Sequence, residues 1–153
     1  MVGQATKWRG QCIQHFAELE LMVETLLRNL AHRVTADQSI TVGMPVGQAF
    51  KQMKDLTGAK GPFASDATAI NRVLQVLERW FEWRAHLTHG VLKIWRDDEG
   101  SWLIVLSHRS AGDGTIRSFA ISWEDARLMQ KELAENLDAF RTEAPALLKA
   151  LKD

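Results

Sequence analysis

Residues 6–34 repeat apolar side chains at helical spacing, and this stripe constrains the fold more than any other feature of the sequence. Intervals of three and four residues place such side chains on one face of a helix. The pattern predicts a long amphipathic helix from about Thr6 to Val34. Leu21 falls opposite the stripe and hints at a second contact surface, such as another subunit. The stripe comprises Trp8, Cys12, Phe16, Leu19, Val23, Leu26 and Leu30.

Two more helical segments follow, separated by loops. Residues 35–45 are predicted to form a loop because Gly43 and Pro45 break regular structure. A short helix is expected over 46–56, and a second loop over 57–62. The third helix should begin at Ser65 or Asp66, which are good N-cap residues, and end near Thr88 or His89.

Three short strands are expected next, over 91–96, 102–109 and 115–122, with turn-forming residues between them. The run from Trp102 to Leu106 is apolar at every position, which predicts that the middle strand is covered on both sides. The third strand alternates as an edge strand does.

A last helix should open at Ser122 as the cap, with Asp125 three residues later in a loose capping-box pattern. Pro145 is expected to kink or split it. The element order α-α-α-β-β-β-α predicts a mainly α protein: an up-and-down helical bundle with an inserted three-stranded antiparallel β-meander. Long antiparallel helices are the simplest packing, and residues 1–153 are expected to form a single domain.

The charge balance and the single cysteine limit the function classes. Nineteen basic residues offset nineteen acidic ones, so a nucleic-acid role requires a local site rather than bulk positive charge. Cys12 is the only cysteine, which excludes an intrachain disulfide and a cysteine zinc cluster and fits a reducing cytoplasm. No apolar run reaches about 18 residues, and no signal region opens the chain, so neither a membrane partner nor secretion is expected.

Six tryptophans and no tyrosine are an unusual aromatic content. Tryptophan favours cores and interfaces, so most of them are expected to anchor helix packing. Base stacking remains open for one or two of them, although they are not regularly interleaved with basic residues.

Arg84 is the residue that helical packing explains least well. Projected at about 100° per residue, the third helix has one broad apolar arc, and Arg84 falls inside it. Arg72, Arg79 and His86 fall on the opposite, polar side. An arginine on an apolar face is costly to bury without an anionic partner.

Three structural explanations of Arg84 stay open beside a functional one. It can pair with a glutamate of another helix, such as Glu20 or Glu24, stack on Trp80 one turn earlier, or reach solvent at the helix end.

His89 lies about 140° around the helix from Arg84. The two side chains can converge only if the helix frays or ends there, or if a two-fold axis brings in a second copy. Otherwise His89 is a C-terminal histidine that interacts with the helix dipole.

Other histidines give weaker signals. His86 and His89 are three residues apart, but two histidines alone are weak evidence for metal, and no metal site is predicted. His15 projects onto the apolar arc of the first helix and is expected to be a satisfied core histidine. Arg28 and His32 have only three intervening residues and are expected to face solvent together on one helical turn.

The segment Arg84-Ala85-His86-Leu87-Thr88-His89-Gly90, closing an amphipathic helix, resembles the signature of the HEPN superfamily. That signature is an arginine, usually a polar residue, three more residues and a histidine, often followed by glycine. Ala85 departs from it, because asparagine, aspartate or histidine is usual there. The resemblance covers the motif and the helical layout only, and the β-meander looks like an elaboration.

The resemblance implies a helical bundle that dimerises with the motif at its two-fold axis. It further implies a metal-independent endoribonuclease without cofactors, of a toxin–antitoxin or defence system, in which Arg84 holds the scissile phosphate and His89 transfers protons. A 2′,3′-cyclic phosphate would result. His86 and Arg79 would assist, Glu82 would orient an imidazole, and Lys93 and Arg109 would contact the RNA backbone. The rival expectation is a non-catalytic dimer that binds a nucleotide or a partner protein, such as an antitoxin.

Overall fold

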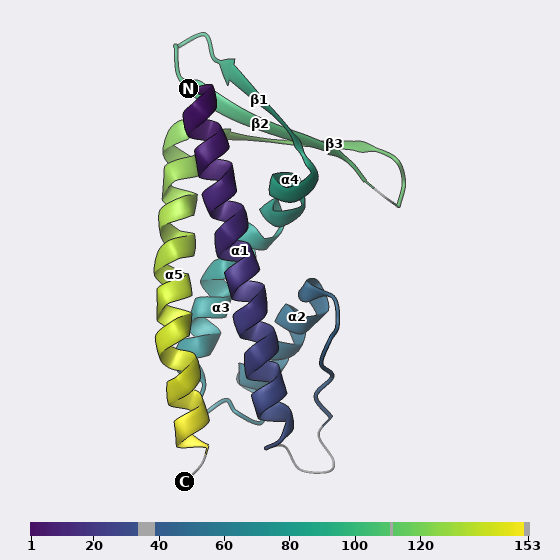
Figure 1. Cartoon of the computed structure of the whole chain (residues 1–153), viewed down its shortest axis with the longest axis vertical. Helices are drawn as coiled ribbons and strands as arrows, with labels where there is room; N and C mark the ends of the chain where they lie inside the picture. The colour runs from purple at the N-terminus through teal and green to yellow at the C-terminus, as the bar shows by residue number, and fades with distance from the viewer. Residues whose placement is uncertain (34–38, 111, 152–153) are drawn as a thin grey trace. The chain divides into compact units, whose positions relative to one another are not determined.

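The computed structural model describes residues 1–33, 39–110 and 112–151. It confirms a mainly helical fold in which a three-stranded antiparallel meander precedes the last helix (Figure 1). The elements are α1 (Val2–Ala31), α2 (Val46–Thr57), α3 (Thr68–Phe81), α4 (Trp83–His89), β1 (Val91–Arg96), β2 (Trp102–Arg109), β3 (Ile116–Ser122) and α5 (Trp123–Ala150).

The chain divides into two compact units. The sheet unit contains residues 1–16 and 78–134, and the helical unit contains 17–77 and 135–153. Because α1, α3 and α5 each contribute residues to both, neither unit is a continuous piece of the sequence. That the whole chain is one domain stays a prediction.

The apolar stripe of α1 is buried along its full length, as its spacing predicts. In the sheet unit, Trp8 is 1% exposed, and its indole N–H donates to the carbonyl of Ala126 on α5 at 2.6 Å. In the helical unit, Leu26 and Leu30 lie in the core. Burial of each such side chain is worth about 2 kcal/mol. The helix begins at Val2, earlier than the expected Thr6, and ends at Ala31, before Val34, which itself lies outside the described residues.

Helices α1 and α5 run in the same direction within each unit. In the sheet unit, Trp8 bonds to Ala126, and Gln11, further along α1, accepts a hydrogen bond from Gln130, further along α5. In the helical unit, Glu18 pairs with Arg141, and Arg33 bonds to the carbonyl of Leu148. The expectation of antiparallel packing is therefore wrong for this pair of helices.

The third predicted helix is two helices. Regular hydrogen bonding stops after Phe81 and resumes at Trp83, although Glu82 keeps helical dihedral angles (φ −62°, ψ −31°). No glycine or proline marks the break. The start is also later than predicted, at Thr68, because Ser65 and Asp66 lie in a preceding turn and bond to each other.

The sheet has strand order β1-β2-β3, with β1 and β3 at its edges. Its register pairs Ile94 with Ile104 and Ile104 with Ile121. Helix α4 packs against the inner face of the sheet, where Ile104 and Leu106 are 0% exposed. On the outer face, Leu103 and Val105 remain partly exposed. The prediction that β2 is covered on both sides is wrong within the described chain.

The start of α5 has the predicted capping box. The backbone N–H of Asp125 donates to Oγ of Ser122 at 3.0 Å, and that hydroxyl donates to the Asp125 carboxylate at 2.7 Å. The first bond satisfies one of the backbone donors that a helix N-terminus leaves open, and the second joins the two side chains. Further on, α5 continues through Pro145 as one helix to Ala150 instead of splitting.

Leu21, the apolar residue opposite the α1 stripe, is 68% exposed. It lines an apolar groove of about 310 Å³ in the helical unit, together with Met22 and Pro145. A second subunit at this surface stays a prediction. No helix in the described ranges is both long and apolar enough to span a membrane.

Candidate functional site

Arg84 and His89 both lie on α4, which is helical from Trp83 to His89. Because the helix is regular over this range, their side chains leave it about 140° apart. Arg84 is partly buried and His89 is exposed. The structure therefore places the two residues on one short helix but does not bring their side chains together within one chain.

Arg9 of α1 is positioned at the C-terminal end of α4. Its Nε donates to the carbonyl of Leu87 at 2.6 Å, and a terminal guanidinium nitrogen donates to the carbonyl of Thr88 at 3.3 Å. The last carbonyls of a helix have no partner within it and carry partial negative charge. Arg9 satisfies two of them and places a fixed positive charge at the end of α4 that carries His89.

Gly90 ends α4 and allows close packing there. Its N–H donates to the carbonyl of His86 at 2.8 Å. A β-carbon at this position would collide with that same carbonyl oxygen and would lie 3.4 Å from the side chain of Leu106 on β2. The glycine after the histidine thus has a structural reason, the tight passage from α4 into β1.

His86 is buried and does not face solvent, so its projected placement is wrong. The residue is 3% exposed and lies between His108 of β2 and Phe119 of β3, with ring centroids 4.2 Å away in each case. The side of α4 that the projection assigned to solvent is covered by the inner face of the sheet. Leu87, on another side of the same turn, is 0% exposed.

The imidazoles of His86 and His108 are directly joined. Their Nδ1 atoms are 3.0 Å apart, so one ring must donate a proton and the other accept it. Burial lowers the pKa of His86, and the neighbouring His108 lowers it further. Arg117 acts in the same direction, whereas a hydrogen bond to the backbone of Leu106 and the charge of Glu82 oppose it. The surroundings of His86 therefore favour its uncharged ring over the protonated one.

The other predicted substrate-binding residues lie at separate places in the sheet unit. Arg79 pairs with the Glu132 carboxylate, and its guanidinium lies 5.2 Å from the centroid of the Trp80 ring. Arg109 donates to the carbonyl of Gly114 at 2.7 Å in the β2–β3 turn. Lys93 is exposed on β1. A shared role of these residues with His86 stays a prediction.

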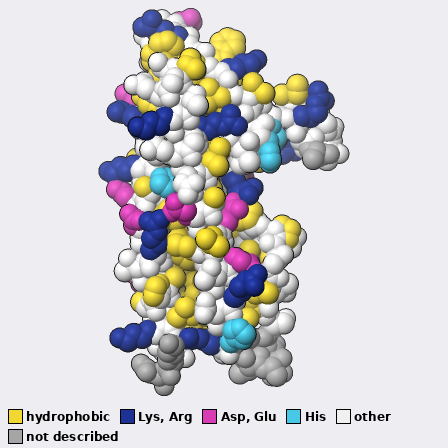
Figure 2. All heavy atoms as spheres, in the orientation of Figure 1, with side chains coloured by type: hydrophobic (Ala, Val, Ile, Leu, Met, Phe, Trp, Pro, Cys, Tyr) yellow, Lys and Arg dark blue, Asp and Glu magenta, His cyan; other side chains and the backbone are white. Residues whose placement is uncertain are grey.

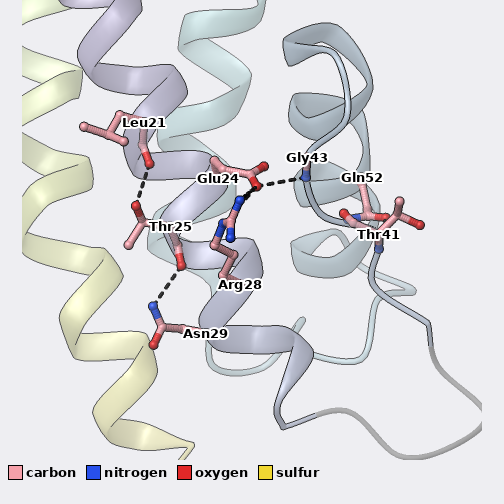
Figure 3. A network of polar contacts seen from close by, with 8 residues as sticks. All are labelled: Leu21, Glu24, Thr25, Arg28, Asn29, Thr41, Gly43 and Gln52. Carbon is pink, nitrogen blue, oxygen red and sulfur yellow. Dashed lines mark hydrogen bonds and ion pairs between the residues drawn. The ribbon is translucent and has the colours of Figure 1, made fainter.

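Two of the partners suggested for Arg84, Glu24 and Trp80, each have another arginine beside them. The carboxylate of Glu24, one suggested partner, accepts hydrogen bonds from Arg28 at 3.1 Å and from the backbone N–H of Gly43 at 2.9 Å (Figure 3). The ring of Trp80, the suggested stacking partner, has Arg79 beside it. Glu20 and the helix-end position remain open as explanations.

The pair Arg28 and His32 lies on the surface as expected. The side chain of Arg28 is 62% exposed and bonded to Glu24, and His32 is exposed just after the end of α1. The pair therefore offers a matched comparison for Arg84 and His89, because it has the same residue types without a covering sheet.

His15 and Cys12 lie on the buried side of α1. Nδ1 of His15 is buried without a hydrogen-bond partner among the described residues, so the expectation of a satisfied core histidine is wrong. Burial raises the pKa of the Cys12 thiol to about 12, which makes it unreactive near neutrality. Across residues 1–33, 39–110 and 112–151, no three histidine, cysteine or acidic side chains are grouped so as to hold a metal ion.

Two residues of this region were not identified from the sequence. His108 could have been predicted from the alternation of β2. It lies an even number of residues from the buried Ile104 and Leu106, so its side chain is on the same face of the strand. Arg9 gives no such signal, since its contact with Leu87 spans 78 positions of the chain.

Comparisons with models of protein families, with curated proteins and with solved structures give no match to this chain.

Proposed function

We propose that this protein is a metal-independent endoribonuclease of the HEPN type, acting as a homodimer in a toxin or defence system of the cytoplasm. The observation that supports this best is the exposed His89 at the C-terminal end of α4, on the same helix as Arg84, where the guanidinium of Arg9 binds the carbonyls of Leu87 and Thr88. A fixed cation near a titratable imidazole suits cleavage of a phosphodiester.

In the proposed reaction, Arg84 binds a non-bridging oxygen of the scissile phosphate and offsets charge that develops in the transition state. His89 accepts the proton of the 2′-hydroxyl as that oxygen attacks phosphorus. The bond from phosphorus to the 5′-oxygen breaks, this oxygen takes up a proton from water, and His89 returns its proton to solvent. The products are a 2′,3′-cyclic phosphate and a 5′-hydroxyl, and no metal ion takes part.

The proposal requires two copies of the chain. On a regular α4 the two side chains point about 140° apart, so one copy cannot direct both at one phosphate. A two-fold axis beside α4 would place Arg84 of one copy near His89 of the other. Arg9, at the end of each α4, would add positive charge to the shared cleft.

The test is cleavage of single-stranded RNA by the purified protein in EDTA, with detection of the 2′,3′-cyclic phosphate end. We expect Arg84→Ala and His89→Ala each to lower the rate by 10²-fold or more, the scale of a lost acid–base or electrostatic group. Arg28→Ala and His32→Ala are matched controls and should retain the full rate. Intact RNA in every sample, or an equal loss in the controls, would overturn the proposal.

A second candidate is a non-catalytic dimer that binds a nucleotide or a partner protein, such as an antitoxin. The observation that favours it is the divergence of Arg84 and His89 on α4, together with Ala85 in place of a polar residue. It predicts binding of RNA or nucleotide that Arg84→Ala weakens, without cleavage. A monomer at micromolar concentration in light scattering would exclude the composite site.

A further inference from the structure

The outer face of the sheet is an open surface on the sheet unit. The register places alternate residues of each strand on this face, opposite the side covered by α4. Three of its large apolar side chains are mostly exposed: Ile116 at 67%, Val91 at 62% and Trp95 at 58%. The face consists of Val91, Lys93, Trp95, Leu103, Val105, Ser107, Arg109, Ile116, Ser118, Ala120 and Ser122.

The charge of this outer face has one sign. Lys93 and Arg109 are its only ionisable residues, and neither is matched by an acidic residue on the same face. Figure 2 shows hydrophobic and basic side chains near one another on the part of the sheet region that this view displays. Two copies packed face to face would bring four cations together without a counter-charge, which disfavours self-association. An anionic partner with flat apolar groups fits both properties of the face.

We propose that the outer face binds single-stranded RNA, with one base stacked on Trp95 and phosphates paired with Lys93 and Arg109. Naming RNA rests on the function proposed above. Stacking on an exposed aromatic ring together with backbone contacts to cations is the general way in which proteins hold single strands. Trp95 is 58% exposed and can be reached by a base, whereas Trp8 is buried.

The positions of these residues suit a strand that lies along the face. Trp95 pairs with Leu103 and Lys93 with Val105, while Arg109 lies four residues further along β2. At about 3.3 Å per residue, Lys93 is about 7 Å from the level of Trp95, and Arg109 is about 13 Å beyond Lys93.

The Arg109 end of the sheet is also the end at which β1 begins, directly after His89 and Gly90. RNA held by its base at Trp95 therefore extends toward His89, and the face would position the strand that the α4 site cleaves.

The test measures binding of a fluorescein-labelled single-stranded RNA to the His89→Ala protein by fluorescence anisotropy in EDTA, so that cleavage does not interfere. Trp95→Leu keeps an apolar side chain but removes stacking, and it should weaken binding about 10-fold. Trp95→Phe should restore most of the affinity. Trp102→Leu is the control, because Trp102 is 40% exposed but belongs to the other face by register.

The contribution of charge is read from the salt dependence. Lys93→Ala and Arg109→Gln should each reduce the slope of log affinity against log salt by about 0.7, the value for one phosphate contact on a single strand. Lys60→Ala removes an exposed cation from the helical unit and should leave the slope unchanged.

Unaltered RNA affinity in Trp95→Leu and Lys93→Ala overturns the proposal. The proposal is also overturned if these variants change the sedimentation of the protein but not its RNA affinity, because the face would then be an interface between copies. Equal competition by polyglutamate would identify an acidic protein partner instead. Trp95-dependent binding without cleavage by the wild-type chain leaves the face established and removes the ribonuclease. Cleavage that depends on Arg84 and His89 but not on Trp95 would support the ribonuclease and overturn RNA binding by the outer face.

Discussion

Nδ1 of His86 on α4 lies 3.0 Å from Nδ1 of His108 on β2, and this contact joins the helix that carries the candidate site to the inner face of the sheet. Only a pair with one shared proton makes the bond, because two protonated rings would direct two N–H groups at each other. The charge state of His86 therefore affects how α4 is held.

The first prediction concerns pH. Burial, followed by His108, lowers the pKa of His86 below its usual 6.5 in the folded protein. As the pH falls, His86 is protonated in the unfolded chain before it is protonated in the folded protein. The contribution of uncharged His86 to stability is therefore complete above about pH 6.5 and is lost as the pH falls through the folded pKa. We expect urea unfolding to show a falling free energy below pH 6.5, by at most about 1.4 kcal/mol per pH unit from this group.

The substitution His86→Phe tests this assignment. It should flatten the dependence of the unfolding free energy on pH below 6.5, whereas His32→Phe at an exposed position should leave that dependence unchanged. An unchanged slope in His86→Phe, or a His86 ring that titrates above 6.5 by NMR, contradicts the prediction.

The second prediction concerns Arg9. Arg9→Ala removes the donors to the carbonyls of Leu87 and Thr88 and the favourable charge at the end of α4. Because the site is only partly buried, we expect a loss of about 1 kcal/mol in the free energy of unfolding. Hydrogen exchange at the amides of α4 and at Gly90 should also accelerate. Lys7→Ala, an exposed change on the same helix, is the control, and equal effects of both variants would refute the capping role.

The third prediction compares two glycines. Gly90→Ala places a methyl group against the carbonyl of His86 and near Leu106, so it should destabilise the fold by about 1–3 kcal/mol, as overpacking does. Gly10 lies inside α1 with nothing within 4 Å of an added β-carbon. Gly10→Ala should stabilise the fold by about 0.5–1 kcal/mol. Thermal unfolding of both variants checks the contrast, and the same sign of shift in both would be inconsistent with it.

Local patterns were sufficient for most of the elements. The α1 stripe, the bounds of β1 and β2 and the Ser122–Asp125 cap follow from side-chain spacing and from turn and cap residues within a few positions. The break at Glu82 could not be predicted in this way, because it lacks glycine and proline and keeps helical dihedral angles.

The candidate site was predictable only in part. The sequence identifies Arg84 and His89 as members of a motif, and a regular α4 retains the angle between them that the projection implies. The solvent-facing placement of His86 failed because a helical projection describes one helix alone. It contains no information on which sides of the helix a distant sheet will cover.

The sequence by itself determined the periodicity of the helices, the order of the elements and the presence of the Arg84–His89 motif, since each depends on residues close together in the chain. The tertiary structure decided which faces are covered. It buried His86 against His108, placed Arg9 at the end of α4 and left Trp95 on an open sheet face. These outcomes depend on contacts between residues distant in sequence, which local spacing does not specify.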